Sequence, residues 1–193
     1  MSEYGHALFE TAIGACGLAW GPAGLIGVLL PEASAAATQA RLERRYPDAQ
    51  TASPPATVEA AINGMVGLLA GEATDLTFVV LDLDRVGGFE REVYAIARAI
   101  RPGETLTYGE VAAKLGDKTS ARVVGRALGL NPWPIVVPCH RVLAANGKAG
   151  GFSAPGGLQT KARMLSIERA RIGGAPGLFD DLPLAVRPRR PGG

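Results

Sequence analysis

A short apolar run closed by proline at both ends constrains the fold of this chain more than any other stretch. Residues 135–137 (Ile-Val-Val) lie between Pro134 and Pro138 and lead directly into Cys139 and His140. β-Branched residues in such a run favour a buried strand. The prolines stiffen its ends and remove backbone donors from the ladder. We therefore expect a strand whose end presents Cys139 and His140 at a site.

Composition predicts a folded chain with a substantial core and an uneven charge distribution. Hydrophobic residues make up 47% and charged residues 20%, with a formal net charge of +2, which excludes global disorder. Between residues 111 and 166 the only acid is Asp117. The same stretch holds eight basic residues: Lys114, Lys118, Arg122, Arg126, Arg141, Lys148, Lys161 and Arg163. This asymmetry indicates a polyanionic partner better than the net charge does.

The two cysteines are expected to be free thiols in a cytoplasmic protein. Cys16 and Cys139 lie far apart, and the N-terminus lacks the pattern of a signal peptide. The apolar run 25–30 is too short to cross a bilayer, so we expect no membrane association. With His6 and His140 as the only histidines, the ligands are too few and unsuitably spaced for structural zinc, and we expect no metal.

Hydrophobic periodicity predicts an α/β (α+β) fold in two domains, with the boundary at residues 84–88. The first domain, 1–87, is a small α/β unit, and the second, 88–172, is mainly helical and contains the cysteine motif. Residues 173–193 are rich in Gly, Pro and Arg and are expected to form a loosely held tail. The predicted strands lie at 7–14, 16–20, 25–30 (with a hairpin over 16–30), 76–81 and 135–137, and the helices at 34–46, 57–70, 89–100, 107–116, 120–129 and 158–171.

Two of these helices form a candidate helix-turn-helix. Residues 107–116 and 120–129 are separated by a tight turn, with Ser120 or Thr119 as the N-cap of the second helix. The second helix carries Ala121, Val123 and Gly125, which are small for a helix that reads base edges. Small side chains favour shape and phosphate contacts over sequence readout. By spacing alone, a DNA-binding unit and a plain helical core are equally good interpretations.

Cys139 is the candidate nucleophile. His140 can take its proton directly or through one water, and Arg141 either lowers the pKa of the thiol or fixes loop carbonyls. Glu168 is the only acid between residues 118 and 179, so it is the candidate group that orients His140. An inert core thiol and a cysteine hydrolase are the competing interpretations. The sequence shows no motif for the peptide cleft that a hydrolase would need.

At these residues the chain resembles a known family, the O6-alkylguanine-DNA alkyltransferases, also called methylated-DNA–protein-cysteine methyltransferases. The resemblance covers roughly residues 88–170 and includes several motifs in the family's order. These are 107–110 (Thr-Tyr-Gly-Glu), 121–125 (Ala-Arg-Val-Val-Gly), Asn131-Pro132, 135–142 (Ile-Val-Val-Pro-Cys-His-Arg-Val), 156–158 (Gly-Gly-Leu), Lys161 and Leu165. It implies a ribonuclease-H-like N-terminal domain and a winged-helix-like helix-turn-helix in the C-terminal domain.

The resemblance also implies an activity: irreversible, single-turnover transfer of the alkyl group from O6-alkylguanine in DNA to Cys139. The base would be flipped out through the minor groove, and no cofactor would be needed. The partner would be double-stranded DNA containing O6-alkylguanine. We expect a monomer in solution, with cooperative loading on DNA left open. A lesion-binding protein that does not remove the alkyl group is the alternative, although relatives of that class carry tryptophan in place of the cysteine.

Roles carry over residue by residue from the same resemblance. Cys139 would accept the alkyl group, His140 and Glu168 would relay the proton, and Asn131 would brace the turn before the active-site strand. The DNA-binding residues would be Ser120, Ala121, Arg122, Val123, Gly125 and Tyr108, with Arg122 filling the space of the flipped base. The substrate pocket would be formed by Tyr108, Pro134, Val142, Phe152 and Ser153. Phe152 stands where many members have tyrosine, and the loop 152–157 is longer than theirs.

Overall fold

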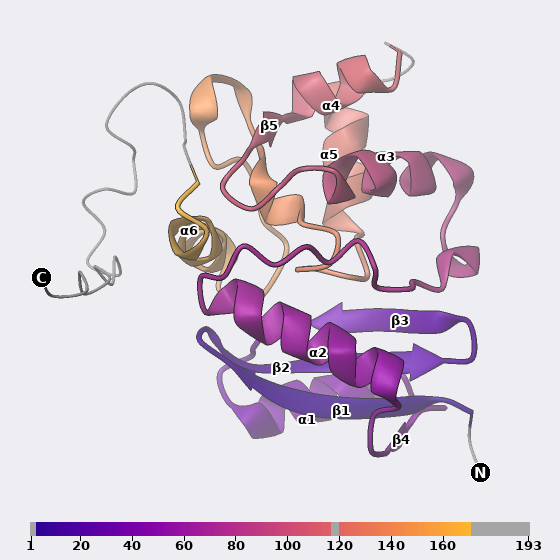
Figure 1. Ribbon diagram of the computed structural model, residues 1–193. Helices are drawn as coiled ribbons and strands as arrows, with labels where there is room; N and C mark the ends of the chain where they lie inside the picture. Colours follow the sequence, from indigo (N-terminus) through magenta and orange to yellow (C-terminus); the bar gives the residue numbers. More distant parts are fainter. Residues whose placement is uncertain (1–2, 117–119, 171–193) are drawn as a thin grey trace, which may run out of the picture.

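The computed structural model describes residues 3–116 and 120–170 and is a mixed α/β structure (Figure 1). The N-terminal half contains a four-stranded sheet in the order β3-β2-β1-β4. β1 pairs antiparallel with β2 and parallel with β4, and β2 pairs antiparallel with β3. The strands are β1 (Gly5–Thr11), β2 (Gly14–Gly21), β3 (Gly24–Leu29) and β4 (Gln50–Thr51).

Helices α1 (Ala35–Arg45) and α2 (Ala56–Leu69) cover opposite faces of this sheet (Figure 1). The pleat explains the sorting, because successive strand residues point to opposite faces. Leu18 belongs to the cluster on the α2 face, whereas the next residue, Ala19, packs with Leu42 of α1. The Ser34 side chain caps α1 by accepting a hydrogen bond from the Ala37 N–H at 3.2 Å.

The C-terminal half is mainly helical. Its helices are α3 (Gly88–Arg98), α4 (Tyr108–Lys114), α5 (Ala121–Gly129) and α6 (Gly157–Ile167). Two short parallel strands pair, β5 (Leu106–Thr107) and β6 (Val142–Leu143). Short 3₁₀ turns lie at η1 (Leu83–Arg85), η2 (Cys139–Arg141) and η3 (Ala145–Gly147). A capping box formed by Thr107 and Glu110 fixes the start of α4 beside the site.

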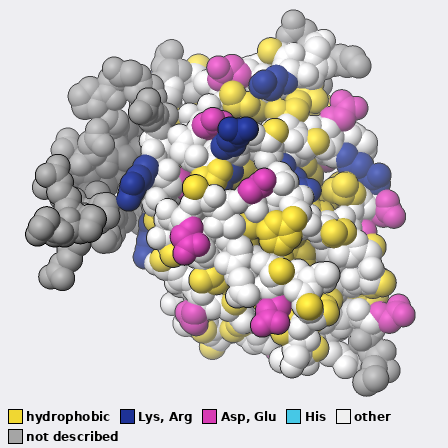
Figure 2. Space-filling model, in the orientation of Figure 1, with side chains coloured by type: hydrophobic (Ala, Val, Ile, Leu, Met, Phe, Trp, Pro, Cys, Tyr) yellow, Lys and Arg dark blue, Asp and Glu magenta, His cyan; other side chains and the backbone are white. Residues whose placement is uncertain are grey.

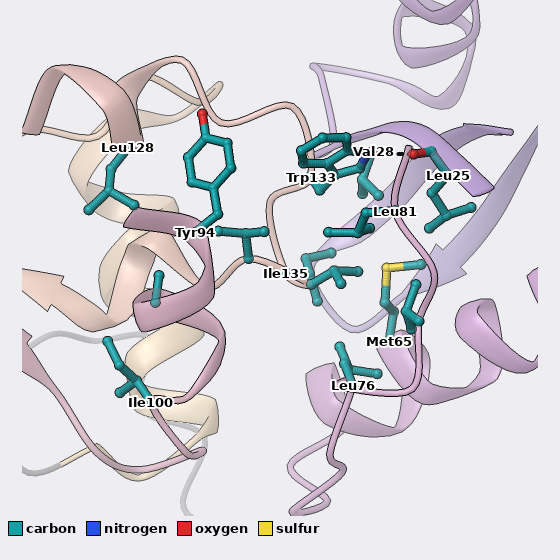
Figure 3. Packing of buried hydrophobic residues seen from close by; sticks show 14 of the residues in the cluster. Leu25, Val28, Met65, Leu76, Leu81, Tyr94, Ile100, Leu128, Trp133 and Ile135 are labelled. Carbon is teal, nitrogen blue, oxygen red and sulfur yellow. Dashed lines mark hydrogen bonds between the residues drawn. The ribbon is translucent and has the colours of Figure 1, made fainter. Parts of the chain in front are cut away.

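One hydrophobic cluster runs through both halves of the chain (Figure 3). Trp133 is fully buried at the junction and donates from Nε1 to the Leu25 carbonyl of β3 at 2.7 Å. Its ring lies edge-on to Tyr94 of α3, with centroids 6.1 Å apart. The Tyr94 hydroxyl donates to the Ala127 carbonyl in α5 at 3.0 Å. These contacts join the sheet, the segment around Trp133 and helices α3 and α5. The domain limits 1–87 and 88–172 stay a prediction.

Two predicted strands are wrong, and the backbone partners explain why. The segment 76–81 has no ladder: its carbonyls at Leu76, Thr77 and Val79 accept from the Arg98 side chain, and only Leu81 forms an isolated bridge. The run 135–137 is a turn, because Ile135 has a φ of 77°, which breaks an extended strand. The observed bounds of the hairpin and of the predicted helices differ from the predicted bounds by only a few residues.

Two expectations for the start of α5 and one for the C-terminus concern Ser120, Thr119 and the tail. Ser120 occupies the N-cap position of α5, but its side chain makes no capping hydrogen bond. Thr119 and the tail 173–193 lie outside the described residues. Within 3–116 and 120–170, no helix has the length and apolar character that crossing a membrane requires.

The face shown in Figure 2 carries acidic, basic and hydrophobic side chains intermixed. Phe78 and Val80, in the segment that joins the two halves, are among the exposed hydrophobic residues, at 53% and 65% exposure. Neither sign of charge dominates this face, so it is not the basic surface that a polyanionic partner would need.

Candidate active site

Cys139 opens η2 and lies half-buried in the wall of a cavity of about 770 Å³, the main cavity. Tyr108 and Arg122, from α4 and α5, line it. Phe152 and Ser153, from the loop before α6, also line it. The volume is in the range of sites that hold a small organic molecule, so the thiol faces a space large enough for a ring system.

Asn131 fixes the turn that carries the cysteine. Its side-chain amide donates to the Val137 carbonyl at 2.8 Å, and its Oδ1 accepts from the Trp133 N–H at 2.9 Å. Together with the positive φ of Ile135, these bonds hold residues 131–138 as a compact turn in place of a strand. The turn begins directly after α5 and therefore ties the thiol to the end of that helix.

The two residues after Cys139 form a buried ionic group with Glu168. His140 Nε2 is 2.9 Å from Glu168 Oε1. Arg141 donates from Nε and Nη2 to the two oxygens of Glu168, each at 2.8 Å, and from Nη1 to the Ile100 carbonyl. Arg141 therefore fixes the chain near His140 by binding Glu168 and a loop carbonyl, which favours its structural interpretation over the electrostatic one.

The charges of this group follow from burial and hydrogen bonding. Burial alone would raise the pKa of Glu168, but hydrogen bonds from His140 and Arg141 outweigh it and lower the pKa to about 2. Burial lowers the pKa of His140 despite the neighbouring carboxylate, so the imidazole is neutral near pH 7. An ionised Glu168 only accepts, so His140 Nε2 must donate and Nδ1 is the free acceptor. Within the part of the chain that the structure describes, Nδ1 is buried and has no hydrogen-bond partner.

The thiol of Cys139 is subject to opposing influences. Burial raises its pKa, whereas the Asn131 side chain and the positive charge of Lys161 lower it. Cys16, in contrast, is deep in the sheet, and burial raises its pKa to about 12, which makes it unreactive. The site therefore singles out one of the two cysteines as a nucleophile.

Comparisons with known proteins identify the family of the chain. Residues 88–170 match the family described as 6-O-methylguanine DNA methyltransferase, DNA binding domain. The methylated-DNA–protein-cysteine methyltransferase of Methanothermobacter thermautotrophicus is 34% identical over 158 residues, covering 82% of this chain and 81% of that protein. Its counterpart in Mycobacterium bovis is 38% identical over 141 residues, covering 72% and 83%.

The chain belongs to the methylated-DNA–protein-cysteine methyltransferase family.

Solved structures of the family have the same fold. The Mycobacterium tuberculosis O6-methylguanine methyltransferase superimposes with a TM-score of 0.68 at 33% identity, covering 92% of this chain and 99% of that one. The Mycobacterium tuberculosis OGT in complex with DNA gives 0.66 at 32% identity, covering 88% and 95%.

The other predicted residues of this family member fall into two groups. Ala121, Arg122 and Gly125 line the main cavity, while Ser120 and Val123 are exposed on α5 outside it. The Tyr108 hydroxyl donates to the Gly151 carbonyl at 3.5 Å, and the Ser153 hydroxyl donates to the Gly129 carbonyl at 3.0 Å.

Val142 and Pro134 do not line the main cavity. The Val142 side chain is fully buried, and its carbonyl accepts from Lys161 Nζ at 2.7 Å. Pro134 lines a second, smaller cavity that also reaches Cys139.

Lys161 is the charged group that sequence reasoning did not place at the site. Its side chain is fully buried in α6, and Nζ lies 5.9 Å from the Tyr108 ring centroid and 6.0 Å from that of Phe152. Burial lowers its pKa to about 8. A lysine on a helix is normally exposed to solvent. In the sequence, only the position of Lys161 in a family motif indicates that it belongs to the site.

Proposed function

We propose that this protein repairs DNA by moving the alkyl group of O6-alkylguanine irreversibly onto Cys139, as a methylated-DNA–[protein]-cysteine S-methyltransferase. The observation that carries the proposal is the position of Cys139. It lines a cavity large enough for a base, and the next residue, His140, is buried and paired with Glu168.

The proton relay follows from the hydrogen-bond roles. The thiol proton would pass through a water to His140 Nδ1, while Nε2–H donates to Glu168, which stabilises the imidazolium. The Cys139 thiolate would then form a bond to the alkyl carbon as the carbon–O6 bond breaks. The electron pair stays with the guanine, which takes up a proton. Because the thioether is not hydrolysed, each molecule would act once.

The DNA-binding surface is inferred from α4 and α5. We propose that they form a helix-turn-helix, with Arg122 entering the base stack and Tyr108 meeting the flipped base. The small residues Ala121 and Gly125 on the cavity wall support close approach of the helix backbone. The protein would act as a monomer on duplex DNA containing O6-alkylguanine. The sheet order β3-β2-β1-β4, with β1 parallel to β4, supports a ribonuclease-H-like N-terminal domain over residues 1–87.

Mass spectrometry tests the reaction. After incubation with a duplex containing O6-methylguanine labelled in the methyl group, the Cys139 peptide should gain one labelled methyl. Cys139→Ala should gain none, and Cys16→Ala is the matched control that should still be methylated. Binding of the lesion with an unmodified Cys139 in the wild type would instead support the lesion-binding alternative.

A further inference from the structure

A second cavity, of about 210 Å³, adjoins the main one at the nucleophile. Cys139, Phe152 and Ser153 line both of them. If the main cavity holds the guanine, the reacting carbon lies at Cys139, where the two spaces meet. The part of an alkyl group beyond the first carbon then has room in the second cavity.

The walls of the second cavity come from segments that sequence reasoning did not connect. Ala154 and Pro155, in the long loop before α6, form one side. This loop is held at both ends, because the Ser153 hydroxyl donates to the Gly129 carbonyl and the Thr160 hydroxyl donates to the Pro155 carbonyl at 2.7 Å. The long loop therefore shapes a space beside the thiol.

Helix α1 contributes two cations to the lining of the second cavity, Arg41 and Arg45. Arg41 is paired with Glu32. Arg45 donates from Nε to the Tyr46 hydroxyl at 3.1 Å, and its guanidinium lies 5.8 Å from the Tyr46 ring centroid. Among the described residues Arg45 has no ion pair, and no acidic side chain lines this cavity. The cavity that Cys139 lines is therefore also lined by one cation that has no ion pair among the described residues.

We propose that the second cavity is a subsite for O6-alkyl groups that end in a carboxylate, with Arg45 as the group that recognises the anion. This inference rests on the proposed alkyl transfer and names a substrate class for it. A guanidinium presents planar donors that match a carboxylate, and Tyr46 restricts the head of Arg45 on one side. A methyl group would not reach the subsite.

The chemistry is the same substitution with a longer substituent. The Cys139 thiolate bonds to the first carbon of the carboxyalkyl group, and the carbon–O6 bond breaks. The electron pair goes to the guanine, which recovers the proton that left the thiol. The carboxylate is unchanged and stays on the protein as a carboxyalkyl thioether, so no further reactant is needed.

The experiment compares three duplexes in single-turnover kinetics. They carry O6-methylguanine, an O6-(carboxyalkyl)guanine, and the O6-(carbamoylalkyl)guanine of equal length, whose amide has the same shape but no charge. In the wild type the carboxylate should be transferred about fivefold faster than the amide, the scale expected for one partly exposed ion pair. This ratio should fall to about one in Arg45→Gln and be largely retained in Arg45→Lys.

Arg44→Gln is the matched control, because it removes an equal charge from an exposed neighbour that does not line the cavity. It should keep the carboxylate preference. A carboxylate-to-amide ratio of one in the wild type, or a ratio unchanged in Arg45→Gln, would overturn the subsite. Methyl transfer without transfer of either longer group would also overturn it while leaving the proposed function intact. Failure of methyl transfer itself would overturn both.

Discussion

At the scale of single residues, Glu168 is the counter-ion of the buried Arg141. Both oxygens of the carboxylate bind Arg141, and one also binds His140. Glu168→Gln would leave a buried guanidinium without its counter-ion, which costs about 3 kcal/mol. Urea unfolding should show this loss, whereas Glu92→Gln, at an exposed position of α3, should unfold like the wild type. Equal unfolding midpoints for the two variants would contradict the assignment.

The same carboxylate predicts how stability changes with pH. The pKa of Glu168 is about 2 in the folded protein against an ordinary value of 4.5. The stabilisation of the folded state by ionised Glu168 is therefore complete above pH 4.5 and is lost as the pH falls from there towards 2. Because the pKa of His140 is lowered in the folded protein, the unfolded chain binds its proton more readily, so the folded state also loses stability as the pH falls below 6.5. The unfolding free energy of the wild type should fall on acidification, and Glu168→Gln should show a flatter curve below pH 4.5.

Lys161 provides a second test, of the nucleophile itself. Its positive charge lowers the pKa of the Cys139 thiol, so Lys161→Met should raise that pKa. The pH profile of Cys139 alkylation by iodoacetamide should move to higher pH, with a rate at neutral pH about tenfold lower. Lys148→Met removes an exposed charge as the control. Identical profiles for Lys161→Met and the wild type would refute this role.

The residues of the site could be predicted from sequence where chemistry restricts the choice. Glu168 was identified because the surrounding sequence contains no other acid, and the structure places it against His140. The burial of Lys161 could not be predicted, since it depends on Tyr108, Phe152 and the Val142 carbonyl converging from three segments. The partners of Arg141 are long-range for the same reason.

At the scale of elements, amphipathic helices were predictable and apolar runs without periodicity were not. The α3 pattern locates the helix within two residues, because its buried face repeats at helical spacing. The run 135–137 is buried, whereas Phe78 and Val80 of the run 76–81 are exposed, so burial explains only the first. Apolar composition does not show that Arg98 will bind the carbonyls of 76–81, or that Asn131 will bind the Val137 carbonyl. These side-chain hydrogen bonds determine the conformation of both segments.

Helix α5 offers a matched pair of arginines for testing DNA binding. Arg122 lines the cavity beside Cys139, whereas Arg126 is exposed one turn later and does not. If Arg122 replaces the flipped base, Arg122→Ala should slow methyl transfer from a duplex about tenfold, since unstacking then lacks compensation. The loss should be much smaller on a single strand, which needs no flipping. Arg126→Ala should affect both substrates equally and weakly, and an equal loss on both for Arg122→Ala would contradict the role.

At the scale of the whole molecule, the shared core implies that the two halves unfold together. Trp133 joins them through the Leu25 carbonyl, the ring of Tyr94 and a single continuous hydrophobic cluster (Figure 3). The active-site turn begins at Asn131 and contains Trp133, so the position of Cys139 depends on the same junction. The N-terminal half therefore supports the geometry of the catalytic half.

Trp133→Phe tests this coupling. It keeps an apolar ring but leaves the buried Leu25 carbonyl without its donor, at a cost of about 1–3 kcal/mol. Fluorescence of the variant comes from Trp20 alone and reports the sheet. Pulsed hydrogen exchange of α3 reports the other half. Both signals should move together to lower denaturant, whereas Leu130→Ala, at a side chain 62% exposed, should leave them in place. If the sheet and α3 unfolded at separate denaturant concentrations in the wild type, the two halves would be independent. Trp133 then could not couple the folding of the sheet to the position of Cys139.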